Sequence, residues 1–288
     1  MNSLIELVQE NLEWAMAIFI GFGMLLGGIE FLMEWRNKQL DKQRLKEMLG
    51  SFLVYLPQQL LKGVSGVIVF YVFYFISDFI PWKIPINIWT VLLAIVVVDL
   101  NYYWEHRIGH EVRLFWSYHS IHHSSPIYNF SVAYRVSFIA DFFGWIFYLP
   151  CILLGFDPMV ILLCLALGLT YQIWLHTSII GKLGWFGKIF NTPSHHRVHH
   201  GSDEIYLDKN YGAIFILWDR LFGTFQEEVF TPTYGLTKQL GTINPIDVHF
   251  REMSNIVKDV KQSSNSKHAL KYIFGHPGWK PDESGTKQ

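Results

Sequence analysis

The chain has 288 residues, of which 51% are hydrophobic, 17% aromatic and only 16% charged. This composition is too apolar and too poor in charge for an ordinary soluble domain, and it favours a membrane protein. Acidic and basic residues nearly cancel, to a formal net charge of -1, so no overall field indicates nucleic acid as a partner. The two cysteines lie inside apolar runs, which argues against a disulfide framework and leaves histidine as the site-forming residue.

Several apolar runs approach the roughly 20 residues that a helix needs to cross the hydrocarbon core. In chain order they are Trp14 to Met33, Val64 to Ile80, Ile86 to Tyr103, Phe142 to Gly155 and Pro158 to Leu175. The break after Gly155 predicts that the last two runs form a tight hairpin. The segment before the first run has no lysine or arginine. It lacks the basic region of a cleaved signal peptide, so the first run is expected to be retained.

Basic residues predict the orientation of these runs. They crowd the loop after the first run, at Arg36, Lys38, Lys42, Arg44 and Lys46. Because basic residues near a span stay on the cytosolic side, this loop is expected to be cytosolic. Counting spans onward from it places every histidine-rich segment on the cytosolic face. The membrane would be the inner membrane in a bacterium or the endoplasmic reticulum in a eukaryote.

Three histidine clusters stand out beside the apolar runs. They are HRIGH at 106–110, HSIHH at 119–123 and HRVHH at 196–200. On a helix, residues three or four apart share a face, so each cluster directs two or three imidazoles at one point. Chance would give roughly 0.03 HxxHH patterns in this composition, against the two present. Adjacent His122 and His123 diverge by about 100° on a helix, which suits two neighbouring metals better than one.

The clusters supply eight imidazoles, which are too many for one tetrahedral zinc and match two metals with about four ligands each. The predicted ligands, which are also the predicted catalytic residues, are His106, His110, His119, His122, His123, His196, His199 and His200. Neutral nitrogen ligands suit iron, zinc or copper, and affinity order alone does not choose among them. The clusters lack the carboxylates typical of hydrolytic zinc pairs, so the function favours iron.

Other residues are expected beside the metals. His176, in the WLHTS segment at a membrane exit, is a ninth candidate ligand. His195 is assigned a supporting position next to the ligands. Asp99 shares a helical face with His106 and His110, and an intramembrane carboxylate is costly, so we expect it to orient a ligating imidazole. A hydrogen bond between packed helices is the alternative for Asp99.

The remaining candidates are not ranked by the sequence. Supporting carboxylates like Asp99 could come from Glu105, Glu111, Asp208 and Asp219. Three histidines lack ligand spacing and are expected at the surface, namely His249, His268 and His276.

Longer segments around the clusters repeat motifs of a known superfamily. They are YYWEHRIGHE, HSIHHSS, YQIWLHT, NTPSHHRVHHG, DKNYG and LWDRLFGTF. With the membrane runs they resemble the fatty acid hydroxylase/sterol desaturase superfamily over about residues 93–228, and within it the ether-lipid-cleaving branch. The resemblance implies a diiron centre on the eight cluster histidines, with Glu111 directly after the first cluster. It also implies tetrahydrobiopterin or another electron donor. Residues 229–288 are polar and short, whereas the animal enzymes of that branch continue into further hydrophobic spans.

The sequence thus predicts an all-α integral membrane protein of four to five membrane helices, with a cytosolic histidine-rich helical cap holding a dimetal site. We expect membrane helices and a basic loop in residues 1–92, a catalytic domain in 93–228 and a polar tail in 229–288. The expected activity is O2-dependent hydroxylation of a C–H bond in a bilayer lipid. A sterol or fatty acyl desaturase or hydroxylase of the same superfamily is the alternative. A metal-binding membrane transporter is the alternative from another class, but it would mix carboxylates into ligands near the bilayer midplane.

Overall fold

The computed structural model describes residues 2–281, and this part of the chain is helical with no β-strand. The α-helices are α1 (Asn2–Arg36), α2 (Lys42–Asp78), α3 (Ile88–Glu111), α4 (Arg113–His123), α5 (Ala140–Phe143), α6 (Leu149–Leu153), α7 (Pro158–Tyr171), α8 (Pro193–His199), α9 (Leu217–Phe222), α10 (Pro245–Lys261) and α11 (Ser266–Phe274). Short 3-10 helices are η1 (Phe130–Tyr134), η2 (Gly144–Tyr148), η3 (Gln172–Leu175) and η4 (Phe186–Lys188). The expected all-α class is confirmed.

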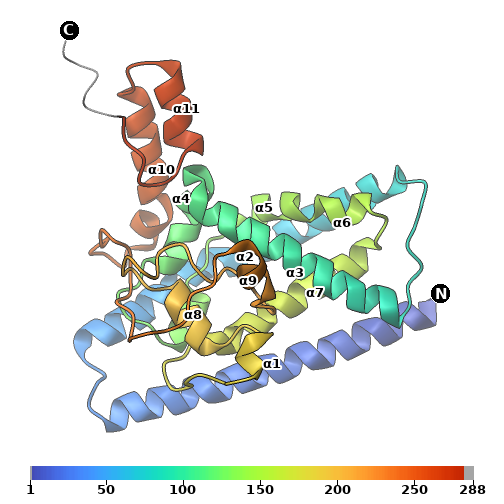
Figure 1. Ribbon diagram of the computed structural model, residues 1–288, viewed down its shortest axis with the longest axis horizontal. Helices are drawn as coiled ribbons and strands as arrows, with labels where there is room; N and C mark the ends of the chain where they lie inside the picture. The colour runs from blue at the N-terminus through green and yellow to red at the C-terminus, as the bar shows by residue number, and fades with distance from the viewer. Residues whose placement is uncertain (1, 282–288) are drawn as a thin grey trace.

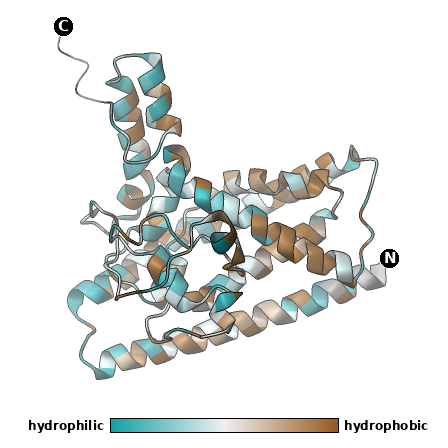
Figure 2. Ribbon diagram, in the orientation of Figure 1, coloured by the Kyte–Doolittle hydropathy of each residue, from teal (hydrophilic) through white to brown (hydrophobic). Residues whose placement is uncertain are grey.

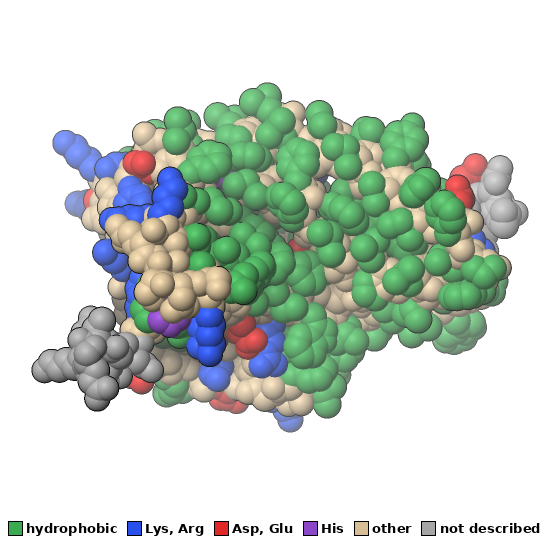
Figure 3. Space-filling view, turned by 90° about the horizontal axis from the view of Figure 1, so that it is seen from above, with side chains coloured by type: hydrophobic (Ala, Val, Ile, Leu, Met, Phe, Trp, Pro, Cys, Tyr) green, Lys and Arg blue, Asp and Glu red, His purple; other side chains and the backbone are tan. Residues whose placement is uncertain are grey.

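Four segments are long and apolar enough to cross a membrane. They are Gln9–Arg36, Lys42–Asp78, Ile88–Glu111 and Pro158–Leu175. Apolar residues dominate the long helices on the side of the molecule nearer the N-terminus (Figure 2), and exposed hydrophobic side chains cover much of the face in Figure 3. The short fourth run breaks into α5, η2 and α6 and turns back into α7. The chain is therefore a multi-pass membrane protein with the expected four long spans and one short apolar segment.

The second membrane helix begins earlier than its apolar run. The run predicted at Val64 is only the second half of α2, which begins at Lys42. Asp41 caps this helix by accepting a hydrogen bond from the backbone N–H of Arg44 at 2.7 Å, which satisfies one of the free donors of the first turn. The basic loop of the sequence prediction is therefore short, because three of its five basic residues belong to the helix. Hydropathy found the apolar half, whereas the cap sets the boundary.

The long helices pack around a core at their middle. Phe73 of α2, Val98 of α3, Ile152 of α6 and Ile161 of α7 are among its buried members. Helix α1 lies along the outside and contacts α7 and η3 (Figure 1). The C-terminal end of α3, together with α4 and α8, lies at the end of the bundle away from the N-terminus. Loops and short helices from residues 176–244 cover this end and form a cap.

The C-terminal segment is folded where it was predicted to be a polar tail. Helices α10 and α11 form a hairpin that packs on α4 and projects from the cap (Figure 1). Helix α10 is amphipathic and buries Val248 and Ile256, which gives a mostly polar sequence one apolar stripe. The guanidinium of Arg113, only 5% exposed, pairs with Glu252 at 2.8 Å and Asp259 at 2.7 Å. A narrow apolar stripe and one buried cation therefore fix a helical hairpin within the segment predicted as a polar tail.

The same hairpin corrects the expectation for His249. Its side chain is buried at 2% exposure, its Nδ1 donates to the Pro245 carbonyl at 2.8 Å, and its ring packs against Phe138. Burial lowers the pKa of His249 below its usual value. His276, in contrast, is largely exposed, as expected.

Replacing Arg113 with glutamine is expected to loosen the hairpin. The carboxylates of Glu252 and Asp259 would lose their shared cation, at a cost of roughly 2 kcal/mol, less than for a fully buried pair because both carboxylates keep some water. Limited proteolysis at the turn between α10 and α11 should become several-fold faster. The matched control is Arg251→Gln, whose pair with Asp247 is longer and exposed. Equal cleavage rates in both variants would contradict this role of Arg113.

Candidate metal centre

Nine histidine side chains converge in two groups at the capped end of the bundle. Group A contains His106, His110, His119, His123 and His199, and group B contains His122, His176, His196 and His200. Within each group the candidate ligand nitrogens lie within 4.8 Å of one another, and seven of the nine residues are buried. The structure thus brings together all eight cluster histidines and the ninth candidate, His176.

Adjacent histidines divide between the two groups. His122 and His123, at the end of α4, belong to group B and group A respectively. His200 and His199, at the end of α8, divide in the same way. Neighbouring residues on a helix point about 100° apart, so one helix end serves two centres. This is the arrangement that the HxxHH spacing predicted.

The nitrogens are spaced as ligands of a first-row metal would be. In group A, Nε2 of His119 lies 3.0 Å from Nε2 of His106 and 3.2 Å from that of His123. In group B, Nε2 of His176 lies 3.1 Å from that of His122 and 2.9 Å from that of His196. Metal–imidazole bonds of about 2.1 Å place neighbouring octahedral ligands roughly 3.0 Å apart. The two groups match that spacing.

The outward ring nitrogens fix where the protons lie. Nδ1 of His106 donates to the Tyr211 carbonyl at 2.8 Å, that of His199 to the Lys209 carbonyl at 2.9 Å, and that of His176 to the Gln172 carbonyl at 2.9 Å. A carbonyl only accepts, so in a neutral ring the proton lies on Nδ1 and a lone pair on Nε2.

Some of the inward-facing ring nitrogens have no hydrogen-bond donor within reach. Nε2 of His110 and Nε2 of His199 are buried without a hydrogen-bond partner among the described residues. Lone pairs that face one another at about 3 Å repel unless a cation lies between them. A bound metal ion in each group would satisfy them, so these residues fit a metal centre.

Burial favours the neutral form of four of the clustered rings. Loss of solvation, followed by neighbouring imidazoles, lowers the pKa of His123, His199 and His200 well below the usual value. Burial lowers the pKa of His122 to about 4. A neutral imidazole is the form that ligates a metal.

One loop supplies partners for three members of group A. Besides the Tyr211 and Lys209 carbonyls, the Asp208 carboxylate accepts from Nδ1 of His110 at 3.2 Å. Asp208 and Asn210 both adopt a φ of 58°, in the left-handed region that aspartate and asparagine tolerate best after glycine. The loop corresponds to the DKNYG motif, and its two αL residues turn the carbonyls of Lys209 and Tyr211 toward the imidazoles.

Two carboxylates fix this part of the chain: one binds the loop, and the other binds the segment that follows it. Asp219 accepts from the backbone N–H groups of Tyr211 at 2.7 Å and Gly212 at 2.9 Å. Asp99 accepts from Ile214 at 2.8 Å, Phe215 at 3.1 Å and the Trp218 indole at 2.9 Å. The expectation that Asp99 contacts an imidazole was therefore wrong. Seven residues of helix separate it from His106 by about 10 Å, so it acts on the segment after the loop.

Two other supporting residues lie elsewhere than expected. Glu111 forms an exposed ion pair with Arg107 at 2.8 Å instead of meeting a ligand. The His195 ring faces away from both groups and lines a cavity beside Phe225. Only its backbone carbonyl supports the centre, by accepting from Asn210 in the loop at 3.1 Å. Helical direction explains this, since residues next to each other on α8 point to different sides.

The sequence analysis missed Glu30 of α1. This carboxylate is 2% exposed and accepts from the hydroxyls of Thr177 and Ser178, both at 2.9 Å, and from the Ser178 N–H at 2.8 Å. Its other oxygen accepts from the Phe130 N–H at 2.8 Å. Glu30 thereby fixes the segment that follows His176. A carboxylate inside an otherwise apolar run was the available signal, because such a group needs partners.

Residues 91–224 match the fatty acid hydroxylase family. This part of the chain is similar to a fatty acid hydroxylase domain. All nine histidines of the two groups lie within the matched residues, as do Asp99 and Asp208. Glu30 lies outside them.

Relatives extend the likeness beyond the matched residues. Alkylglycerol monooxygenase of Homo sapiens is 37% identical over 282 residues, which cover 96% of this chain and 62% of that protein. The Danio rerio protein of the same name is 36% identical, over 96% of this chain and 61% of its own length. The ornithine lipid hydroxylase OlsE of Rhizobium tropici is 31% identical over 52% of this chain and 45% of that protein. This chain thus spans about three-fifths of the alkylglycerol monooxygenases. No solved structure matches it.

Substituting Asp208 with asparagine is expected to weaken metal binding in group A. Asparagine tolerates the left-handed backbone but removes the charge that holds Nδ1 of His110. Partners of this kind change metal affinity by about 10- to 100-fold. Titration with a metal chelator should strip one metal from the variant at a lower chelator concentration. Glu111→Gln, in an exposed pair, serves as control, and indistinguishable titrations would refute the role of Asp208.

Metal binding by group B is expected to depend on Glu30. Glu30→Gln replaces one acceptor oxygen with an amide N–H, which would face donors of Thr177, Ser178 or Phe130. We expect metal content to fall from two ions to about one per chain, since His176 loses its fixed position. Glu34→Gln, one turn along α1 and paired with Arg44, is the control. Full metal content in the Glu30 variant would show that the segment holds without it.

Proposed function

We propose that the protein is a membrane-bound non-haem diiron monooxygenase that hydroxylates a lipid C–H bond with O2, and that the lipid carries an ether-linked alkyl chain. The convergence of nine imidazoles in two adjacent groups is the observation that supports it most. The match to the fatty acid hydroxylase family and relatives named as lipid monooxygenases or hydroxylases support the reaction class.

Each group would hold one iron ion through its histidine nitrogens. Iron held by neutral nitrogen ligands would supply the redox chemistry that O2-dependent C–H oxidation requires. The described ligands in the two groups are all histidine, whereas hydrolytic metal pairs use a carboxylate base.

The chain's own residues keep the centre dry and its rings in place. The Trp116 ring lies 5.0 Å from that of His110 and 5.6 Å from that of His123, between ring centroids. Tyr128 lies 5.2 Å from His200 in the same measure. These aromatic rings form a wall that excludes water from the nitrogens, and water would otherwise divert a reactive intermediate.

A lipid can reach such a centre from the bilayer. Group A begins on the last turns of α3, a helix with membrane-spanning length, so an alkyl chain can enter laterally while its headgroup stays at the interface. The basic residues at the junction of α1 and α2 favour a cytosolic position for this end of the bundle. The membrane would be a bacterial inner membrane or the endoplasmic reticulum.

Attack beside an ether oxygen would convert hydroxylation into cleavage. One atom of O2 enters the C–H bond next to the ether oxygen, and the other leaves as water with two electrons and two protons from a donor. Tetrahydrobiopterin or another two-electron donor would supply these electrons and protons. The resulting hemiacetal separates into a fatty aldehyde and a glycerol. The shared name of the relatives in two vertebrates favours this substrate over a sterol.

Labelling with 18O2 tests the proposal. The purified protein is loaded with iron and given an alkylglycerol, a reductant and 18O2, and aldehyde is trapped at once by borohydride reduction. We expect an 18O-labelled fatty alcohol that depends on reductant and is lost in His123→Ala, a variant of group A. His268→Ala, outside both groups, should keep the activity. A hydroxylated acyl chain or a desaturated sterol in parallel incubations, without aldehyde, would replace the ether substrate by the alternative activity.

A further inference from the structure

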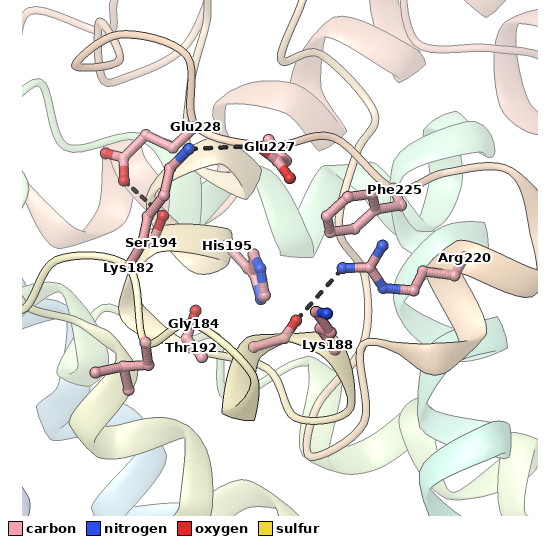
Figure 4. A pocket seen from close by; sticks show the side chains of 12 residues that line it. Lys182, Gly184, Lys188, Thr192, Ser194, His195, Arg220, Phe225, Glu227 and Glu228 are labelled. Carbon is pink, nitrogen blue, oxygen red and sulfur yellow. Dashed lines mark hydrogen bonds and ion pairs between the residues drawn. The ribbon is translucent and has the colours of Figure 1, made fainter.

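The cavity lined by His195 lies on the side of α8 away from the imidazole groups. It has a volume of about 480 Å³ and is lined by segments 182–195 and 220–228. Figure 4 shows His195 at its centre, with Arg220 and Phe225 to one side, Lys188 below and Glu227 and Glu228 above. None of the nine clustered histidines lines it.

The cations of this cavity are only partly neutralised. Glu228 is bound by the guanidinium of Arg197, with two contacts of 2.7 Å, and Glu227 pairs with Lys182 at 3.3 Å. Within the described chain, Lys188 and Arg220 form no ion pair. Once the charges of the two ion pairs are set aside, the positive charges of Lys188 and Arg220 remain.

Arg220 is held in position for a ligand. Its guanidinium carbon lies 3.7 Å from the centre of the Phe225 ring, and one N–H group reaches the Gly187 carbonyl at 3.4 Å. The other N–H groups have no partner among the described residues. A planar guanidinium fixed on an aromatic face suits recognition of phosphate.

His195 adds an unused polar group. Its side chain is 8% exposed, and its Nδ1 is buried without a hydrogen-bond partner. A buried ring nitrogen without a partner is costly unless a ligand supplies one. A phosphate oxygen would accept a hydrogen bond from this ring and charge-assisted bonds from Arg220 and Lys188.

The surroundings place the cavity beside lipid. Phe186 and Phe190, in the same segment as Lys188, pack in one cluster with Leu26 of the membrane helix α1. Trp185, next to Phe186 in the chain, is 72% exposed. A tryptophan exposed beside a membrane span is typical of the level of lipid headgroups.

We infer that this cavity binds the phosphate ester headgroup of a membrane lipid, through Arg220, Lys188 and His195. The inference concerns binding alone and does not depend on the proposed reaction.

Native mass spectrometry of the full chain in detergent tests this site with dioleoyl phosphatidic acid, dioleoylglycerol and inorganic phosphate. We expect retention of phosphatidic acid but not of dioleoylglycerol. In Lys188→Gln/Arg220→Gln the affinity for phosphatidic acid should fall by about tenfold or more, as expected for lost charge-assisted hydrogen bonds. Arg251→Gln/Lys258→Gln, on α10, removes the same charge elsewhere and should leave binding unchanged.

A further variant distinguishes a loss of phosphate recognition from a loss of folding. Glu227→Gln frees Lys182 from its exposed pair, so it should tighten binding of phosphatidic acid without disturbing the core. Equal retention of dioleoylglycerol, or equal loss in the α10 control, would overturn phosphate recognition at this cavity. Inorganic phosphate that binds as tightly as phosphatidic acid would overturn its assignment to a lipid.

Discussion

The capped end of this protein is organised around the repulsion between buried lone pairs. Nine imidazoles point nitrogens at two small volumes, where nothing in the described chain donates to Nε2 of His110 or His199. Such an arrangement is stabilised where outward nitrogens have acceptors and each inward set shares a cation. The cap can be understood as the means of supplying those acceptors. The DKNYG loop, the carbonyl of Arg135 and the start of η3 each provide one or more.

Buried carboxylates in turn hold the acceptors. The cap contains little regular structure, so its backbone N–H groups lack helical partners and need others. Asp99, Asp219 and Glu30 each accept from backbone amides of these loops. Each is a side chain of a helix, so rigid elements fix the irregular ones. Carboxylates thus stabilise the centre without contacting an imidazole of it, Asp208 being the exception.

Local periodicity made much of this predictable. Apolar runs gave the spans, and HxxxH and HxxHH spacing gave the histidines and their division between two centres. The remainder depended on contacts across the chain. Asp208 meets His110 from 98 residues away, and no spacing rule identifies it among four candidate carboxylates. Asp99 lies on the same face of α3 as His106, as expected, but it accepts hydrogen bonds from a segment that begins 115 residues away. His249 lacks ligand spacing, yet tertiary packing buries it, and α2 begins at a polar cap that hydropathy cannot detect.

The division of adjacent histidines between groups has a consequence for assembly. Helix ends at 122–123 and 199–200 belong to both centres, so an ion that enters either group immobilises both helix ends. The second ion then meets imidazoles whose conformational entropy is already lost. Loading would therefore be cooperative, and the free energy of coupling would act equally in both directions. In the unaltered protein a half-loaded chain would be a minor species, and it would accumulate only where one group is weakened.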